Sequence, residues 1–205
     1  MLAGGTQGAE IRVTVKTAAG APVGDAVVIA VPLRGAPHVA PPKASEIVDQ
    51  IDQEFVPHVK AILVGSSVFF PNKDNVRHHV YSFSPPKVFD LPLYAGTPAR
   101  PVVFDKPGVV VLGCNIHDWM EAYVYVSESP YYVKTAASGG AVLRNLPADR
   151  YTVRVWHPLL ESEESATQQS ADLSTAAALD LSWSVSLRTE FRIRRPPAGE
   201  AHMHY

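Results

Sequence analysis

The chain of 205 residues contains a single cysteine, Cys114, so it cannot form an intrachain disulfide. No apolar run reaches the roughly 18 residues that a membrane-spanning helix needs. Basic and acidic residues nearly balance, at 18 and 20, and leave no basic footprint of the kind that binds nucleic acid. We find no Ser/His/Asp arrangement, no phosphate-binding glycine loop and no paired-carboxylate motif. These absences argue against a disulfide framework, a membrane span, a nucleic-acid partner and an enzyme.

What the chain has in quantity is proline. Its 18 prolines are nearly twice the usual share, and most of them separate short apolar runs. Residues 11–17 alternate strictly, with Ile11, Val13 and Val15 on one face, as in a half-buried strand. The pattern therefore predicts an all-β protein built from many short strands.

Two segments lack a clear period. Residues 43–54 are mostly polar and fit either a helical turn or an exposed strand. Residues 162–178 are rich in Ser, Thr, Ala and Gln, and we predict a loop there.

The strongest chemical signal is the short stretch from Cys114 to Met120. It places Cys114, His117 and Met120 three residues apart, directly after the apolar run 109–112. A thiolate, an imidazole and a thioether are three of the four ligands of a type 1 copper site, which needs a second histidine. That histidine must come from a distant strand, and the pair His78-His79 can supply it.

Around this stretch the sequence resembles the cupredoxins, the family of plastocyanin, pseudoazurin and amicyanin. The resemblance covers residues 46–127 and rests on the run V-F-F-P-N ending at Asn72, a histidine six residues later, and the Cys-Xaa-Xaa-His-Xaa-Xaa-Met loop. It implies a Greek-key β-sandwich, here residues 43–127, that holds one copper ion for electron transfer. The whole chain is also similar to periplasmic proteins often labelled methylamine-utilisation proteins, which carry the F-D-K-P-G and C-N-I-H motifs seen at residues 104–108 and 114–117.

The choice between the two histidines stays open. Counting from Asn72 puts His78 at the cupredoxin ligand position, and His79 at a position where many relatives have an asparagine that bonds to the cysteine loop. Strand parity favours His79, because Tyr81 and Phe83 would then share its inward face and Phe83 would help keep water from the metal. We prefer the ligand set His78, Cys114, His117 and Met120, with His79 as the alternative.

In cupredoxins the histidine of the ligand loop usually reaches the surface, and here it is His117. We expect Ile116 and Trp119, with Pro85-Pro86 nearby, to form a small apolar patch that suits a transient redox partner. Asp118 either steers a basic partner to this patch or caps the turn by bonding its own backbone. The residues with a supporting or docking role are Asn115, Asp118 and Trp119.

The flanking segments resemble the two halves of a carboxypeptidase-regulatory-like, transthyretin/Ig-like β-sandwich. One half carries the D-A-V-V strand that starts at Asp25, and the other an L-P-A run that starts at Leu146. A two-stranded opening hairpin cannot bury its own apolar face. We therefore predict a discontinuous domain of residues 10–40 plus 128–195 with the cupredoxin inserted into it, followed by a flexible tail, residues 196–205.

The leading hypothesis is a periplasmic type 1 copper protein that transfers single electrons to an unidentified redox partner protein. One alternative is a copper carrier or store that uses the same ligands. Another is a cell-envelope interaction module whose copper site is vestigial. Residues 1–9 read either as the end of a removed signal peptide, which fits the periplasm, or as a plain chain terminus. The oligomeric state stays open.

Overall fold

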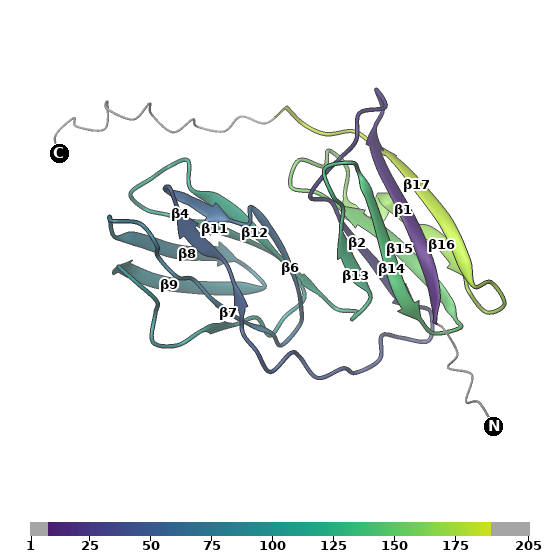
Figure 1. Ribbon diagram of the computed structural model, residues 1–205, viewed down its shortest axis with the longest axis horizontal. Helices are drawn as coiled ribbons and strands as arrows, with labels where there is room; N and C mark the ends of the chain where they lie inside the picture. Colours follow the sequence, from purple (N-terminus) through teal and green to yellow (C-terminus); the bar gives the residue numbers. More distant parts are fainter. Residues whose placement is uncertain (1–7, 190–205) are drawn as a thin grey trace.

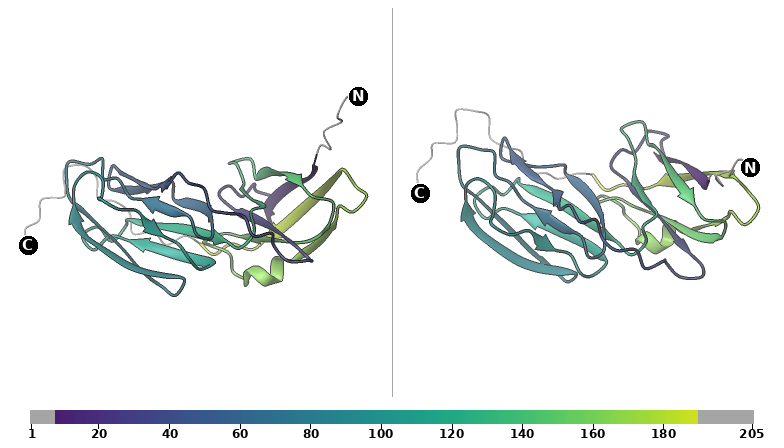
Figure 2. Two further views of the ribbon diagram at one scale, coloured as in Figure 1. Left: turned by 90° about the horizontal axis from the view of Figure 1, so that it is seen from below. Right: turned by 60° about the horizontal axis from the view of Figure 1, so that its bottom comes forward.

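The computed structural model describes residues 8–189, which form two β-sandwiches side by side along the long axis of the molecule (Figures 1 and 2). Strands account for nearly all of the regular structure, so the predicted all-β class is confirmed. The predicted tail at residues 196–205 and the N-terminal residues 1–7 lie outside the described residues. No helix in the described part of the chain has the length and hydropathy that a membrane crossing needs.

The first sandwich comprises residues 46–127 and consists of a five-stranded sheet, a three-stranded sheet and a hairpin. The five-stranded sheet has the order β6-β12-β11-β8-β9, the three-stranded sheet β10-β7-β3, and the hairpin joins β4 and β5. Its strands are β3 (Glu46–Ile47), β4 (Asp49–Ile51), β5 (Glu54–Val56), β6 (Val59–Leu63), β7 (Ser67–Phe69), β8 (His78–Ser84), β9 (Lys87–Tyr94), β10 (Val102–Val103), β11 (Gly108–Gly113) and β12 (Glu121–Ser127).

The second sandwich combines the two ends of the described chain. Its sheets have the orders β14-β1-β17 and β13-β2-β15-β16, so both N-terminal strands pair with strands that follow β12. Its elements are β1 (Ala9–Thr17), β2 (Val27–Pro32), β13 (Tyr132–Lys134), β14 (Gly140–Leu146), β15 (Arg150–Trp156), the 3-10 helix η1 (Glu164–Thr167), β16 (Gln169–Asp172) and β17 (Ala178–Val185). The independence of the two domains, and a transthyretin-like nature of the second, stay predictions.

The two segments without a periodic hydrophobic pattern, residues 43–54 and 162–178, both contain strands. Residues 43–54 include β3 and β4, and the buried side chains of Val48 and Gln50 hold this segment in the first sandwich. The predicted loop at residues 162–178 is wrong in part, because it contains η1 and β16. Thr167 and Ala171 are buried there, and the hydroxyl of Thr167 bonds to the backbone of β15. Tertiary packing therefore orders a sequence with weak local preference.

The structure shows which side chains of strand β8 face the core. His78, Val80 and Ser82 point into the core and are at most 1% exposed, whereas Phe83 is 80% exposed. The expectation that Phe83 faces inward and shields the metal site is therefore wrong. Val80 fills the inner position and packs in a core whose main members are Phe55, Phe70, Phe104, Leu112 and Val124.

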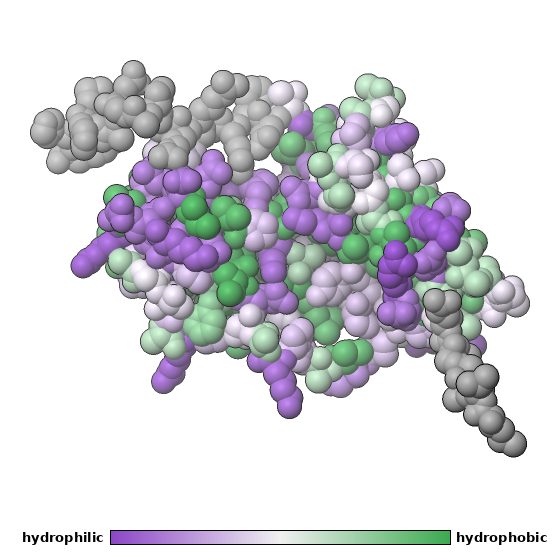
Figure 3. Space-filling model, in the orientation of Figure 1, coloured by the Kyte–Doolittle hydropathy of each residue, from purple (hydrophilic) through white to green (hydrophobic). Residues whose placement is uncertain are grey.

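The two sandwiches meet through the outer face of the five-stranded sheet. Tyr125 of β12 is 4% exposed and packs with Trp156 of β15, with ring centroids 5.4 Å apart. The Tyr125 hydroxyl donates to Glu164, which also accepts a hydrogen bond from Arg154. Burial, followed by the charge of Glu164, raises the pKa of Tyr125. Elsewhere the visible surface mixes hydrophobic and hydrophilic residues over both lobes (Figure 3).

Candidate metal centre

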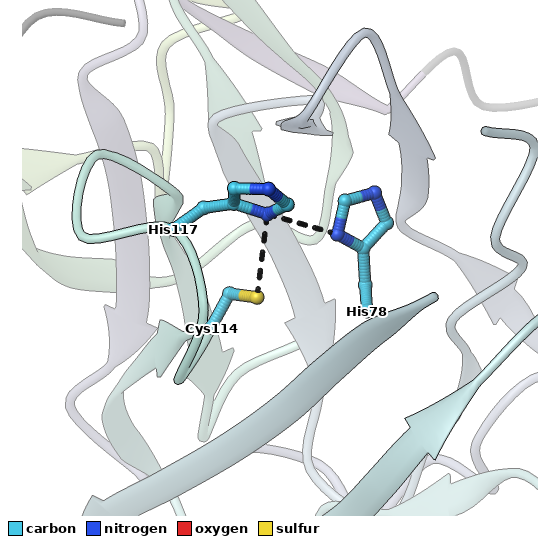
Figure 4. A group of neighbouring side chains, drawn as sticks. All are labelled: His78, Cys114 and His117. Carbon is cyan, nitrogen blue, oxygen red and sulfur yellow. Dashed lines mark hydrogen bonds between the residues drawn. The ribbon is translucent and has the colours of Figure 1, made fainter. Parts of the chain in front are cut away.

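One end of the first sandwich gathers two imidazoles and the only thiol of the chain. His78 lies at the start of β8, Cys114 follows the end of β11, and His117 lies in the loop before β12 (Figure 4). One ligand atom from each of these residues lies within 4.8 Å of the others. His78 and Cys114 are buried, at 0% and 4% exposure, while His117 is half-buried. Among residues 8–189 this is the single cluster of its kind.

The loop from Cys114 to Met120 is fixed by its own backbone. The amide of Met120 donates to the carbonyl of His117 at 3.0 Å, and the amide of Glu121 donates to Trp119 at 3.1 Å. These turns bring Met120 back into the core cluster that also contains Cys114, and its side chain is 2% exposed. The Trp119 ring lies against His117, with centroids 5.0 Å apart, and its Nε1 donates to the carbonyl of Gln53.

His78 is oriented by a carboxylate that we did not predict from the sequence. Its Nε2 lies 2.7 Å from Oδ2 of Asp74, four residues earlier. An ionised carboxylate only accepts hydrogen bonds, so Nε2 is the donor, and in the neutral ring the lone pair is then on Nδ1. The tautomer that can bind a metal through Nδ1 is therefore selected by Asp74.

Asp74 is itself held by the backbone of a neighbouring turn. Its two oxygens accept from the amides of Asp52 and Gln53, at 2.7 and 2.8 Å. Burial alone would raise the pKa of Asp74, but the bonds from the Gln53 amide, the His78 ring and the Asp52 amide outweigh it and hold the pKa below its usual value. The carboxylate that orients His78 is thus kept ionised.

A second set of buried polar groups supports the same loop. Asn72 donates to the carbonyls of Val76 and Tyr94 and accepts from the amide of Asp74. Gln50, which is fully buried, donates to the Tyr94 hydroxyl at 2.7 Å and to the carbonyl of Phe70 at 3.0 Å. Burial raises the pKa of Tyr94 to about 12, and the nearby Cys114 contributes to this rise. Of these supporting residues, only Asn72 could be picked out from the sequence, where it ends the V-F-F-P-N run.

His79 lies outside the cluster. Its Nε2 lies 2.5 Å from Oδ1 of Asp90 on the neighbouring strand β9, and its ring packs against Tyr81. It therefore bonds to β9, and the supporting bond to the cysteine loop that we considered for it is not made. Since β8 turns its even-numbered side chains inward, only His78 can reach Cys114 and His117.

Two of the three separations between the ligand atoms match those that one metal ion requires. Nδ1 of His78 and Nδ1 of His117 lie 3.1 Å apart, and Sγ of Cys114 lies 3.9 Å from Nδ1 of His117. Two imidazole nitrogens bound to one ion at about 2.0–2.1 Å lie roughly 3.1–3.6 Å apart for bond angles of about 100–120°. A thiolate bound at about 2.3 Å lies roughly 3.3–3.9 Å from such a nitrogen for angles of about 100–130°. These separations and the chemistry of the donors therefore fit a metal ion that His78, Cys114 and His117 would hold together.

The expected surface patch is present in part. Ile116 is 46% exposed beside the half-buried His117, and Asn115 and Asp118 are exposed on the same loop. Asp118 forms no hydrogen bond or ion pair with any residue between 8 and 189, so it does not cap the turn.

The expectation that Pro85-Pro86 lies near this patch is wrong. Pro86 lies over Gly108, because a Cβ on that glycine would be only 2.8 Å from the proline ring. Gly108 begins β11, and Cys114 follows the end of that strand. The six residues of extended chain from Gly108 to Cys114 span about 20 Å, so Pro86 lies at the far end of β11 from the ligand loop.

Comparisons with known proteins give no family assignment. No family model matches the sequence, and no curated protein matches it. Among solved structures, an amicyanin variant in its reduced Cu(I) form matches 42% of this chain and 85% of its own, with 19% identity and a TM-score of 0.38. A purple cupredoxin from Nitrosopumilus maritimus matches 40% of this chain and all of its own, with 25% identity and a TM-score of 0.36.

A copper-containing nitrite reductase from Thermus scotoductus SA-01 also matches, with 27% identity and a TM-score of 0.40. The match covers 47% of this chain but only 25% of the reductase. All three TM-scores are low, so the chemistry of the site has to be judged from its own geometry.

Proposed function

We propose that this protein is a type 1 copper protein that transfers single electrons through a site formed by His78, Cys114, His117 and Met120. The observation that carries the proposal is the 3.1 Å separation of two Nδ1 atoms beside the only thiol of the chain. Copper held by these residues would supply one-electron redox chemistry between Cu(II) and Cu(I), and the Met120 thioether and the surrounding hydrophobicity would set its potential.

The residues of this chain have clear roles in such a site. Asp74 holds the Nε2 proton of His78 and leaves Nδ1 free for the metal. Cys114 supplies the thiolate from a buried position, and Met120 supplies a soft thioether in the same core cluster. The half-buried ring of His117 connects the site to the surface. A buried, pre-arranged ligand set suits electron transfer because little has to move when the charge of the site changes.

Addition of Cu(II) to the full chain tests the copper assignment. We expect one copper per chain and an intense visible band from thiolate-to-copper charge transfer. Cys114→Ala and His78→Ala should abolish the band, whereas the matched variant His79→Ala should keep it. A band that survives loss of Cys114, or that depends on His79 and not on His78, would overturn the ligand set.

A second experiment separates an electron carrier from a copper carrier. An electron carrier should pass through repeated oxidation and reduction in the presence of a Cu(I) chelator of moderate affinity and keep its copper. Rapid loss of Cu(I) to the chelator, together with slow electron exchange, would support a copper carrier or store.

We also propose a periplasmic location and a redox partner protein. The location is supported by the resemblance of the sequence to periplasmic proteins. The proposal that the protein is not an enzyme is supported by the sequence, which shows no Ser/His/Asp arrangement, no phosphate-binding glycine loop and no paired-carboxylate motif.

A further inference from the structure

The outer face of the five-stranded sheet is apolar across most of its width, but the second sandwich covers only part of it. On β6 and β12 the outward side chains Val59 and Tyr125 are buried against β2 and β15. On β8 and β9 none of the described residues of the second sandwich covers the face, and Phe83 and its cross-strand partner Val88 are 80% and 63% exposed. An apolar surface that continues beyond one interface and stays exposed is typical of a second interaction site.

This uncovered face contains a cavity of about 380 Å³ that reaches the metal centre. Its lining includes Tyr81, Phe83, Val111, Cys114, Asp118 and Glu121. Tyr81 lies directly over Gly113, because a Cβ on Gly113 would be 2.8 Å from the Tyr81 ring. Gly113 therefore has to be a glycine for Tyr81 to form this wall, and the wall adjoins the backbone of Cys114.

The cavity combines aromatic and acidic groups. Tyr81 and Phe83 pack together on one side, with ring centroids 5.1 Å apart. Asp118 and Glu121 contribute carboxylates, and within residues 8–189 the cavity lining contains no lysine or arginine. Aromatic faces and carboxylates attract the same kind of group, a cation with a flat apolar surface, which among side chains is the guanidinium of arginine.

We propose that this cavity is the docking site of a basic partner protein, which inserts an arginine side chain between the Tyr81–Phe83 pair and the carboxylates of Asp118 and Glu121. A partner bound in this cavity contacts Cys114 and not only the edge of His117, so electrons could pass through Cys114. This electron route rests on the proposed function. The binding itself does not depend on copper. The surface around Phe83 and Val88 provides the apolar part of the contact.

The test uses a tri-arginine peptide as the probe and the full chain, both metal-free and in the diamagnetic Cu(I) form. Backbone NMR shifts are followed during titration, with tri-glutamate and tri-lysine peptides as controls. We expect saturable shifts at residues 111–113 and 118–121, weaker ones with tri-lysine, and none with tri-glutamate. Absence of saturable shifts in the metal-free chain would overturn the docking site without bearing on the copper assignment.

Two variants test the two walls separately. Phe83→Ala and Glu121→Gln should each weaken tri-arginine binding about two- to fivefold, as expected for exposed cation–π and ion pairs. The matched control Leu33→Ala removes a side chain that is 59% exposed outside the first sandwich and should leave the affinity unchanged. Equal binding in all three variants, or shifts confined to the loop around Ile116, would overturn the proposal. Shifts at residues 111–121 that appear on concentrating the protein alone would instead assign this face to a second copy of the chain.

Discussion

Replacement of Asp74 by alanine should weaken copper binding although Asp74 is not expected to touch the metal. The change removes the acceptor that lies 2.7 Å from Nε2 of His78 and leaves the ring free to rotate and to exchange tautomers. Loss of a carboxylate that orients a metal-ligating histidine typically costs 10–100-fold in affinity. With 1.4 kcal/mol for each tenfold change, this corresponds to about 1.4–2.8 kcal/mol.

The same residue offers a finer distinction. Asp74→Asn can still accept the proton of His78 through its amide oxygen, but it loses the charge that strengthens the bond. Its NH₂ group then faces the backbone N–H of Asp52, so two hydrogen-bond donors point at each other and the bond from Asp52 is lost. We expect a loss of copper affinity at the low end of that range, near tenfold.

The chain provides a matched control in the second histidine–carboxylate pair. Asp90 bonds to Nε2 of His79 as Asp74 does to His78, but this pair lies outside the cluster. Cu(I) affinity is measured by competition with a chromophoric chelator, and thermal unfolding of the metal-free variants monitors their folding. If Asp74→Ala binds copper within threefold of the parent, or Asp90→Ala loses as much, the orienting role of Asp74 is refuted.

Four further predictions concern stability. Because the pKa of Asp74 is lowered in the folded state, its carboxylate stabilises the fold at pH values above the pKa of an unfolded aspartate, near 3.9. This stabilisation is lost as the pH falls through the pKa of Asp74 in the folded state. Asp74→Asn should therefore flatten the acid limb of a pH–stability curve. Phe83→Ser should change the free energy of unfolding by less than about 0.5 kcal/mol, whereas Val80→Ser should cost more than about 2 kcal/mol; equal effects would contradict the parity of β8. Tyr125→Phe should cost about 1 kcal/mol in chemical denaturation, because it leaves Glu164 with one partner fewer. A fragment of residues 43–130 should fold and bind copper but self-associate in sedimentation, since Tyr125 and Val59 lose their cover; an unfolded fragment would show that the two sandwiches fold only together.

The ligand loop could be predicted from the sequence because its chemistry is local. Cys114, His117 and Met120 are close in the chain, and a short loop brings them together whatever the surrounding fold. The distant ligand was harder. Counting from Asn72 selected His78, while parity pointed to His79 because aromatic side chains were assumed to face the core. That assumption fails on β8, where both faces carry apolar residues and Phe83 is on the outer one.

The supporting groups could not be predicted because they depend on long-range contacts. Gln50 meets Tyr94 across 44 residues, and Asp74 is held by the amides of Asp52 and Gln53 more than 20 residues away. Nothing in the sequence near these residues distinguishes them from ordinary polar loop residues. One local signal does exist, the spacing of four residues between Asp74 and His78, and it becomes informative only once His78 is known to be a ligand.

Strand β12 shows how the metal centre and the second sandwich constrain one another. Its inward side chains, such as Val124, belong to the core that also holds Cys114 and Met120. Its outward side chain Tyr125 belongs to the interface with β15. The strand begins directly after the ligand loop, so the position of Met120 is fixed at one end of an element that is packed on both faces. Packing on both faces leaves a strand few alternative positions, because a shift that relieves one core disturbs the other. We therefore expect the second sandwich to restrict the ligand loop through β12, and the proposed docking surface is the part of the sheet that this sandwich does not reach.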